Sequence, residues 1–195
     1  MGELFDMDYK AIKEFGIRIP LDCMVGSQVR AAKENVYNRH GVLPLLNSRP
    51  HVTIINILSD FSNYDRIKGV LSHTSKKASF KMKITDVLVG NTDRNGVNTI
   101  FLKIDGCEDF KKLQVLIKDG IRNFTRGKHV GYATTPHITI TKCFPSQVAS
   151  VLSLIDDRLY REIEINAKEV ELIYRDWPGK YGWDWSKRYV VSLRK

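Results

Sequence analysis

The chain has 195 residues, of which 43% are hydrophobic and 27% are charged, a composition typical of a globular protein with a buried core. No apolar run approaches the roughly 20 residues that a membrane-spanning helix needs, and the acidic segment 1–6 lacks the apolar stretch of a signal peptide. We therefore expect a cytoplasmic protein that does not contact a membrane. The net charge of +9 favours a polyanionic partner such as a nucleotide or a nucleic acid.

The sequence indicates no cofactor, no bound metal and no obligate protein partner. Its three cysteines, Cys23, Cys107 and Cys143, are widely spaced and lack the grouping of metal ligands. In an intracellular protein this pattern predicts reduced thiols.

Strand-like and helix-like segments alternate along the chain. Alternation of apolar and polar residues predicts strands, whereas apolar residues three and four positions apart predict helices. In chain order, strands are expected at 15–21, 50–58, 80–89, 99–104, 136–141, 162–174 and 188–193, and helices at about 27–39, 60–75, 108–124 and 146–157. Asn95-Gly96 predicts a hairpin turn between the third and fourth strands. No linker or low-complexity segment divides the chain, so residues 1–195 are expected to form a single domain.

Two short stretches repeat one another about half a chain apart. Pro50–Ile54 and Pro136–Ile140 each read Pro-His-aliphatic-Thr-Ile. The chain has only five histidines, so chance is a poor explanation for two of them in the same setting. Proline is tolerated at the first residue of a strand, where the ladder needs no hydrogen bond from it. Both stretches are therefore predicted to be strands that begin at a proline.

The spacing within each motif predicts a shared face, because side chains two positions apart in a strand point the same way. His51 and Thr53 form one such pair, and His137 and Thr139 form the other. The duplication indicates two similar lobes, each with one motif strand, which would place the four polar side chains across a shared groove. Two ordinary strands with buried histidines are the alternative, and a matched pair argues against it.

Two histidines that face one groove suit the cleavage of a phosphodiester. A neutral imidazole can remove a proton from a ribose hydroxyl or from water, and a protonated imidazole can supply one to the leaving alkoxide. The hydroxyls of Thr53 and Thr139 would donate hydrogen bonds to the non-bridging oxygens, where negative charge develops. No divalent ion is required, and no carboxylate cluster near either motif would hold one. The symmetric motifs leave open which histidine is the base.

The paired motifs and the strand–helix order around them resemble the 2H phosphoesterase superfamily over residues 12–194. The resemblance implies an α+β fold of two pseudo-symmetric lobes, each an antiparallel sheet with outer helices, around a central groove. It also implies a metal-independent phosphodiesterase that acts on an oligonucleotide or a nucleotide. The strand Ile17–Leu21 and the Pro-His-x-Thr-Ile-Ile setting are similar to the viral and A-kinase-anchoring-like branch. The resemblance to that branch implies cleavage of 2′-5′-linked oligoadenylates or related cyclic oligonucleotides, an activity that would oppose nucleotide-based antiviral signalling.

Two other functions remain open on the same motifs. One is a 2′,3′-cyclic phosphodiesterase that processes RNA ends, and the other is a non-catalytic module that holds RNA in a basic groove. A protein that had lost catalysis and kept only RNA binding should also have lost at least one of the four motif residues. All four histidines and threonines of the motifs are present, which favours an enzyme. A serine hydrolase is not indicated, because the sequence has no Gly-x-Ser-x-Gly motif.

Three further residues are candidates for substrate binding. Lys142 would steer a phosphate, although simple strand parity places it on the face opposite His137, where it would be a solvated charge. Tyr132 would stack on a base or pack against a lobe. Trp177 opens an aromatic- and glycine-rich segment at 177–185. Aromatic side chains commonly hold unpaired bases, and packing of this segment against the core is the alternative.

Overall fold

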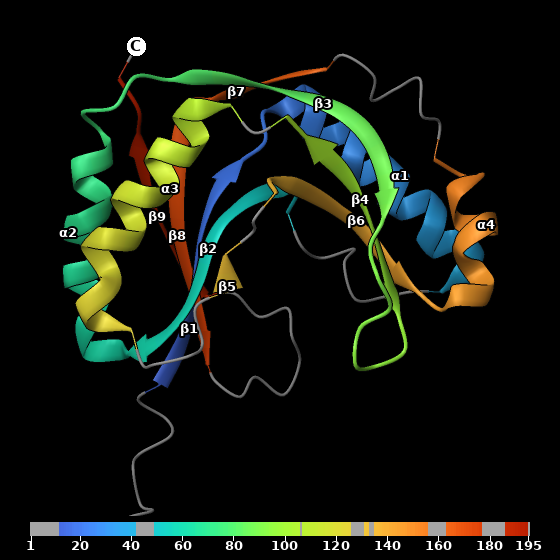
Figure 1. Ribbon diagram of the computed structural model, residues 1–195, viewed down its shortest axis with the longest axis horizontal. Coiled ribbons are helices and arrows are strands. Elements are labelled where there is room, and N and C mark those ends of the chain that lie inside the picture. The colour runs from blue at the N-terminus through green and yellow to red at the C-terminus, as the bar shows by residue number, and fades with distance from the viewer. Residues whose placement is uncertain are drawn as a thin grey trace, which may run out of the picture.

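The computed structural model describes residues 12–41, 49–105, 107–125, 131–132, 135–155, 163–176 and 186–194, with 131, 132 and 186–188 described by backbone alone. These residues form two antiparallel sheets that curve around the centre of the molecule (Figure 1). The first sheet has five strands, in the order β5 (Gly131–Tyr132), β2 (His51–Asp60), β1 (Ile12–Pro20), β8 (Glu169–Asp176) and β9 (Ser186–Ser192). The second sheet has four strands, in the order β6 (His137–Cys143), β4 (Asn98–Ile104), β3 (Phe80–Val89) and β7 (Glu164–Ala167).

The two sheets are built alike. The order β2-β1-β8-β9 in the first sheet has its counterpart in β6-β4-β3-β7 in the second, and β5 is added at the edge of the first. Strand β2 pairs with β1, and strand β6 pairs with β4. In both pairs, one long helix lies between the two strands in the chain. The motif strands β2 and β6 are in contact with each other. The expected α+β fold of two similar lobes is therefore confirmed.

Helices cover the outer sides of both sheets (Figure 1). They are α1 (Cys23–His40), α2 (Tyr64–Thr74), α3 (Glu108–Ile121) and α4 (Val148–Leu152), with short 3₁₀ turns η3 (Phe61–Asn63), η4 (Arg122–Phe124) and η5 (Pro145–Gln147). Helix α1 follows a strand of the first sheet but packs on β6, and α3 follows a strand of the second sheet but packs on β2. Each long helix thus crosses to the other lobe and ties the two together.

Local signals fix the ends of α1. The Asp22 carboxylate accepts a hydrogen bond from the Val25 backbone N–H at 2.9 Å, a standard N-cap. Gly41 ends the helix with φ 62°, in the left-handed region that glycine enters without steric cost. Because Asp22 is the cap, the helix begins at Cys23, a turn earlier than the predicted start at Ser27.

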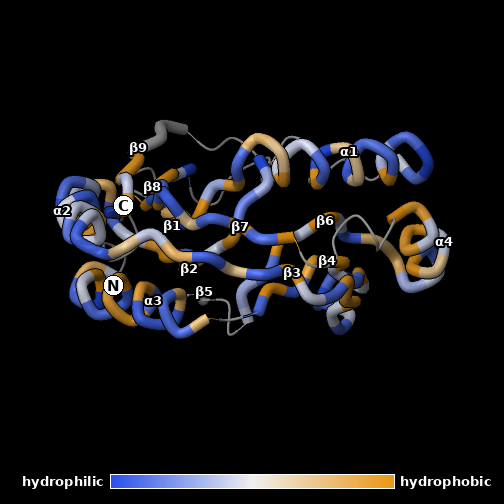
Figure 2. Tube along the Cα trace, turned by 90° about the horizontal axis from the view of Figure 1, so that it is seen from above, coloured by the Kyte–Doolittle hydropathy of each residue, from blue (hydrophilic) through white to orange (hydrophobic). Residues whose placement is uncertain are grey.

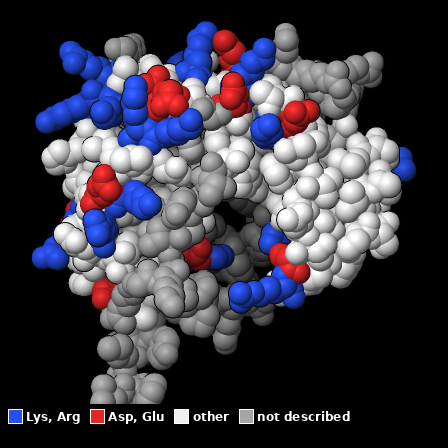
Figure 3. Space-filling view, in the orientation of Figure 1, with Lys and Arg blue, Asp and Glu red and all other residues white. Residues whose placement is uncertain are grey.

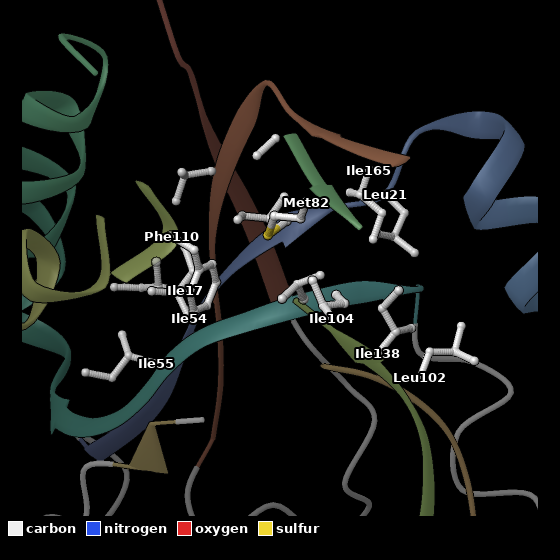
Figure 4. Packing of buried hydrophobic residues seen from close by; sticks show 14 of the residues in the cluster. Ile17, Leu21, Ile54, Ile55, Met82, Leu102, Ile104, Phe110, Ile138 and Ile165 are labelled. Atoms are coloured by element: carbon white, nitrogen blue, oxygen red, sulfur yellow. The ribbon is translucent and has the colours of Figure 1, made fainter. Parts of the chain in front are cut away.

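One apolar core joins the two lobes. Buried side chains from both sheets form a single cluster, and Figure 4 shows the β2 residues Ile54 and Ile55 beside Phe110 of α3, away from Ile138 of β6. Figure 2 shows the hydrophobic positions of α1 on its sheet-facing side and hydrophilic positions outside. A shared core holds the motif strands in a fixed relation, since close-packed interiors tolerate little displacement.

One strand prediction was wrong. Residues 162–174 were expected to form a single strand, but β7 and β8 lie in different sheets, and the chain passes from one lobe to the other at Lys168. Lys168 lies between β7 and β8 and belongs to neither, and its carbonyl accepts a hydrogen bond from the Leu193 backbone N–H at 2.7 Å. Alternation of apolar and polar residues continues through such a crossing, so sequence periodicity does not reveal it.

Two simpler expectations can be compared with the structure. In the described part of the chain, no helix is long and apolar enough to cross a membrane. The three cysteines are free thiols, as predicted.

Candidate functional site

Both motif strands begin in the same way. Pro50 and Pro136 are buried, and their carbonyls accept hydrogen bonds from the backbone N–H of Leu21, just after β1 (3.4 Å), and of Ile104, in β4 (3.0 Å). A proline suits this position because only its carbonyl has to be satisfied there. The strands themselves run from His51 and His137, so each begins one residue after the proline at which it was predicted to start.

Each motif histidine makes the same backbone contact. Nδ1 of His51 lies 2.7 Å from the Arg49 carbonyl oxygen, and Nδ1 of His137 lies 3.0 Å from the Thr135 carbonyl oxygen. A carbonyl oxygen can only accept, so Nδ1 carries the hydrogen in both rings. The hydrogen bond fixes each ring and leaves Nε2 as the atom available to a ligand.

A matched β-bulge follows each motif. In the β1–β2 pair, Arg18 lies opposite Thr53 and Ile17 lies opposite Ile55, so Ile54 is the extra residue. The bulge exposes a backbone acceptor, and Gln114 of α3 donates its side-chain amide to the Ile54 carbonyl at 2.9 Å. A bulge of this kind bends a strand and re-aims the side chains beyond it.

The second motif strand repeats the bulge one residue after its threonine. Phe101 lies opposite Thr139 and Ile100 lies opposite Thr141, so Ile140 is the extra residue. The pattern of buried and partly buried positions is the same in the first seven residues of both strands. The duplication therefore extends to the irregular backbone.

The bulge corrects the parity argument about Lys142. Because Ile140 is an extra residue in β6, the alternation of side chains between the two faces shifts by one residue after it. Lys142 therefore lies on the same face as His137 and Thr139. Its ammonium forms an ion pair with the Asp93 carboxylate at 3.1 Å, across the turn between β3 and β4. Lys142 thus lies on the groove side of β6 and also anchors this turn.

The two half-sites differ in the residue across the sheet from each threonine. Beside the first motif, Arg18 is buried and donates to the buried carboxylate of Glu171. Its Nη1 also lies 3.4 Å from Nδ1 of His51. Since that nitrogen carries a hydrogen for the Arg49 carbonyl, the guanidinium acts on the ring as a nearby charge and not as a donor.

Beside the second motif, an aromatic ring takes the place of the cation. Phe101 contacts the His137 ring with centroids 5.0 Å apart and planes inclined at 54°. Phe101 is partly exposed, and Leu88, opposite it on β3, is 38% exposed. This half-site therefore offers an accessible apolar surface next to its histidine.

The charge difference affects how the first histidine titrates. Burial and the Arg18 guanidinium lower the pKa of His51 to about 3, against the opposing influence of the Arg49 carbonyl. Burial, Arg18 and Arg30 likewise lower the pKa of Lys33, on α1, to about 8. The imidazole of His51 is consequently neutral at physiological pH, the state in which Nε2 can accept a proton. The charge of His137 also acts on His51, which is consistent with the two rings facing one groove.

Figure 3 shows a hollow between the two lobes, with basic and acidic side chains at its rim. The side chains of Tyr132 and Trp177, both predicted to bind substrate, lie outside the described residues, although the Tyr132 backbone pairs with Ile55 of β2. Within the described ranges, no group of three His, Cys, Asp or Glu side chains is placed to hold a metal ion.

Comparison with known proteins agrees with this architecture. The sequence model of the 2′-5′ RNA ligase superfamily matches residues 22–177 of the chain. No curated protein sequence matches at a significant level.

Several solved structures share the fold at low sequence identity. TT0787 of Thermus thermophilus is 13% identical with a TM-score of 0.64, covering 93% of this chain and 100% of its own. Apo LigT of E. coli is 12% identical with a TM-score of 0.59, covering 94% and 99%. Usb1 of Kluyveromyces marxianus is 13% identical with a TM-score of 0.53, covering 95% and 99%.

Proposed function

The chain belongs to the 2′-5′ RNA ligase superfamily, that of the 2H phosphoesterases, and is a phosphodiesterase; we propose that it cleaves 2′-5′-linked oligoadenylates or related cyclic oligonucleotides, using His51 and His137 without a metal ion. The observation that carries this proposal is the repeated setting of the two histidines. Each ring is fixed through Nδ1, and each leaves Nε2 for the substrate. Such an activity would place the protein in the viral and A-kinase-anchoring-like branch and would oppose nucleotide-based antiviral signalling.

The different surroundings of the two histidines give each a role. His51, held neutral by burial and by Arg18, is the base, which leaves His137 as the acid. In a 2′-5′ linkage the free 3′-hydroxyl lies beside the phosphorus. Nε2 of His51 takes the proton of that hydroxyl, and O3′ forms a bond to phosphorus. The bond from phosphorus to O5′ breaks as His137 gives its proton to O5′, so the products are a 2′,3′-cyclic phosphate and a 5′-hydroxyl.

Thr53 and Thr139 would stabilise the charge that develops during this step. Each threonine shares the face of its histidine and lies two residues further along the strand. Hydroxyl donors on both sides of the phosphate would bind its two non-bridging oxygens. Removing one such donor commonly lowers turnover by a factor of about 10² to 10³.

Two features support a nucleotide as the substrate. The net charge of +9 attracts phosphates, and Lys142 adds a cation on the groove face of β6. The accessible ring of Phe101 beside His137 suits stacking of a base, which is the usual way proteins hold unpaired nucleotides. E. coli LigT, which has the same fold, has been crystallised with 3′-AMP and with NADP+.

The test is a panel of substrates incubated with the purified protein. Matched 2′-5′ and 3′-5′ adenylate dinucleotides, cyclic dinucleotides and 2′,3′-cyclic nucleotides would be resolved by chromatography. We expect the 2′-5′ substrate or a cyclic dinucleotide to be cut fastest, with a cyclic phosphate as the first product. The control is the His51→Gln, His137→Gln double variant, which keeps polar side chains at both positions.

Three other results would point elsewhere. Equal rates on the matched 2′-5′ and 3′-5′ dinucleotides would refute the linkage preference. Activity confined to 2′,3′-cyclic nucleotides would favour the enzyme of RNA-end processing. Tight binding of RNA with no cleavage of any substrate would favour the non-catalytic RNA-binding module.

A further inference from the structure

We propose that Asn56 forms a nucleobase-binding subsite in the groove, where its side-chain amide hydrogen-bonds the edge of a base next to the scissile phosphate. This subsite rests on the proposed function and deepens it, because it names the part of the substrate that the first lobe recognises. The residue lies outside the His-x-Thr motifs, and strand parity alone would place it on the opposite face from His51.

The bulge at Ile54 brings Asn56 into the groove. Asn56 lies opposite Gly16 on β1, two positions beyond Arg18, which itself lies opposite Thr53. Residues directly opposite in an antiparallel pair share a face, and so do residues two apart in a strand. Asn56 and Thr53 therefore project to the same side, and both are partly exposed.

Pseudo-symmetry supports the same placement. Asn56 follows its motif threonine by three positions, as Lys142 does in β6, and each follows a bulge. Lys142 is ion-paired with Asp93 across the turn between β3 and β4. In the part of the chain that the structure describes, no hydrogen bond joins the Asn56 amide to another residue.

The neighbours of Asn56 leave its amide without a lateral side chain. Gly16 of β1 and Gly131 of β5 lie directly opposite it on its two sides. Glycine inside a strand commonly marks a place where a ligand or another backbone approaches closely. Among the described residues, the side chain of Asn56 therefore has no side chain directly opposite it on either neighbouring strand, and it lies on the face that carries His51, where it is placed to meet a ligand.

The distance and the chemistry fit a nucleobase. Because Ile54 is an extra residue, Thr53 and Asn56 lie opposite Arg18 and Gly16, which are two positions apart on β1. At about 3.3 Å per residue, Asn56 therefore lies roughly 7 Å beyond Thr53, within reach of the nucleoside attached to a phosphate bound at Thr53. An amide presents one acceptor and a pair of donors, which match the adjacent donor and acceptor on the edge of adenine. A carboxylate of the same shape can only accept. It would match the two adjacent N–H donors of guanine instead.

That contrast gives a test in which the substitution keeps the shape of the side chain. Matched 2′-5′ adenylate and guanylate dinucleotides would compete in one reaction with the wild type, Asn56→Asp and Asn56→Ala. The ratio of kcat/KM for the two bases is the readout, because a new charge near His51 affects both substrates alike. Asn35→Asp, on an exposed turn of α1, adds the same charge outside the groove.

We expect Asn56→Asp to shift the ratio toward guanine by about tenfold or more, and Asn56→Ala to lower kcat/KM for the preferred base by about tenfold. Asn35→Asp should leave the ratio unchanged. Equal ratios in the wild type and both Asn56 variants, with cleavage intact, would overturn the subsite and leave the phosphodiesterase standing. If the wild type cuts neither dinucleotide, binding of adenosine and guanosine monophosphates measured by calorimetry decides the question. An affinity ratio that Asn56→Asp does not change would then reject the subsite.

Discussion

The two motif strands, β2 and β6, share an irregular backbone and differ in the side chain that lies across the sheet from each threonine. Both begin after a buried proline, fix their histidine through Nδ1 and carry a bulge one residue after the threonine. Opposite Thr53 lies the buried cation Arg18, whereas opposite Thr139 lies the partly exposed ring of Phe101. The duplicated backbone therefore gives the two half-sites the same arrangement of histidine, threonine and bulge. The cross-strand residue, a cation in one lobe and an aromatic ring in the other, is one source of the different surroundings of the two histidines.

The largest effect should come from removing either histidine. His51→Ala and His137→Ala should each lower turnover by several orders of magnitude, and the double variant should be little worse than either single, because the pair acts as a unit. Steady-state turnover on the best substrate measures this, with circular dichroism to confirm folding. His73→Ala is the control, since His73 makes a similar Nδ1 contact to a carbonyl at 2.8 Å on α2. Near-wild-type turnover in one single variant would mean that the two half-sites do not share one reaction.

The threonines test whether both half-sites hold the phosphate. Thr53→Val and Thr139→Val keep the shape and remove the hydroxyl, and each should reduce kcat by about 10² to 10³ with little change in KM. Thr85→Val, at an exposed position of β3, is the matched control. A wild-type kcat in either groove variant would show that its hydroxyl does not contact the transition state.

The pH dependence tests the electrostatic difference between the lobes. Burial and Arg18 lower the pKa of His51 to about 3, so its neutral form persists well below pH 6.5. The acid limb of kcat/KM, which reports the free enzyme, should therefore lie well below pH 6.5. The double variant Arg18→Gln, Glu171→Gln removes the positive charge beside the ring without leaving a buried carboxylate unpaired. It should move this limb to higher pH, by about one unit.

The wild-type profile measured across this range provides the reference for that shift. A limb that stays in place when Arg18 and Glu171 are neutralised would show that Arg18 does not set the titration of the base. The contrast between the two half-sites would then be one of shape alone.

The smallest expected effect comes from the aromatic ring of Phe101, which lies beside His137 in the second half-site. Phe101→Leu keeps an apolar side chain but removes the stacking ring beside His137, and it should raise KM by about tenfold with a smaller change in kcat. Phe144→Leu, at a position that is 58% exposed just after β6, is the control. An unchanged KM would assign Phe101 to packing against the histidine only.

Much of this arrangement could be predicted from the sequence. The repeated Pro-His-aliphatic-Thr-Ile pattern gave the two strands, the shared face of each His–Thr pair and two similar lobes, because strand periodicity and proline placement are local properties. The bulges could not be read in this way. Ile54 and Ile140 are ordinary aliphatic residues in apolar runs, so strand parity alone places Lys142 and Asn56 on the face opposite the histidines.

The differences between the half-sites depend on cross-strand neighbours. Arg18 and Phe101 lie far from their motifs in the chain, and only the pairing register brings them opposite Thr53 and Thr139. The matching offsets of Asn56 and Lys142, each five residues after its histidine, were the one signal in the sequence that could have suggested groove positions beyond the motifs.

In the proposed mechanism two histidines perform the reaction without a metal ion, and a chelator distinguishes this mechanism from a metal-dependent one. The initial rate on the best substrate would be measured in excess EDTA, and again after Mg²⁺ or Mn²⁺ is added in excess over the chelator. We expect the same rate in all conditions, since proton transfer by His51 and His137 requires no divalent ion. Activity that is lost in EDTA and restored by either ion would contradict it.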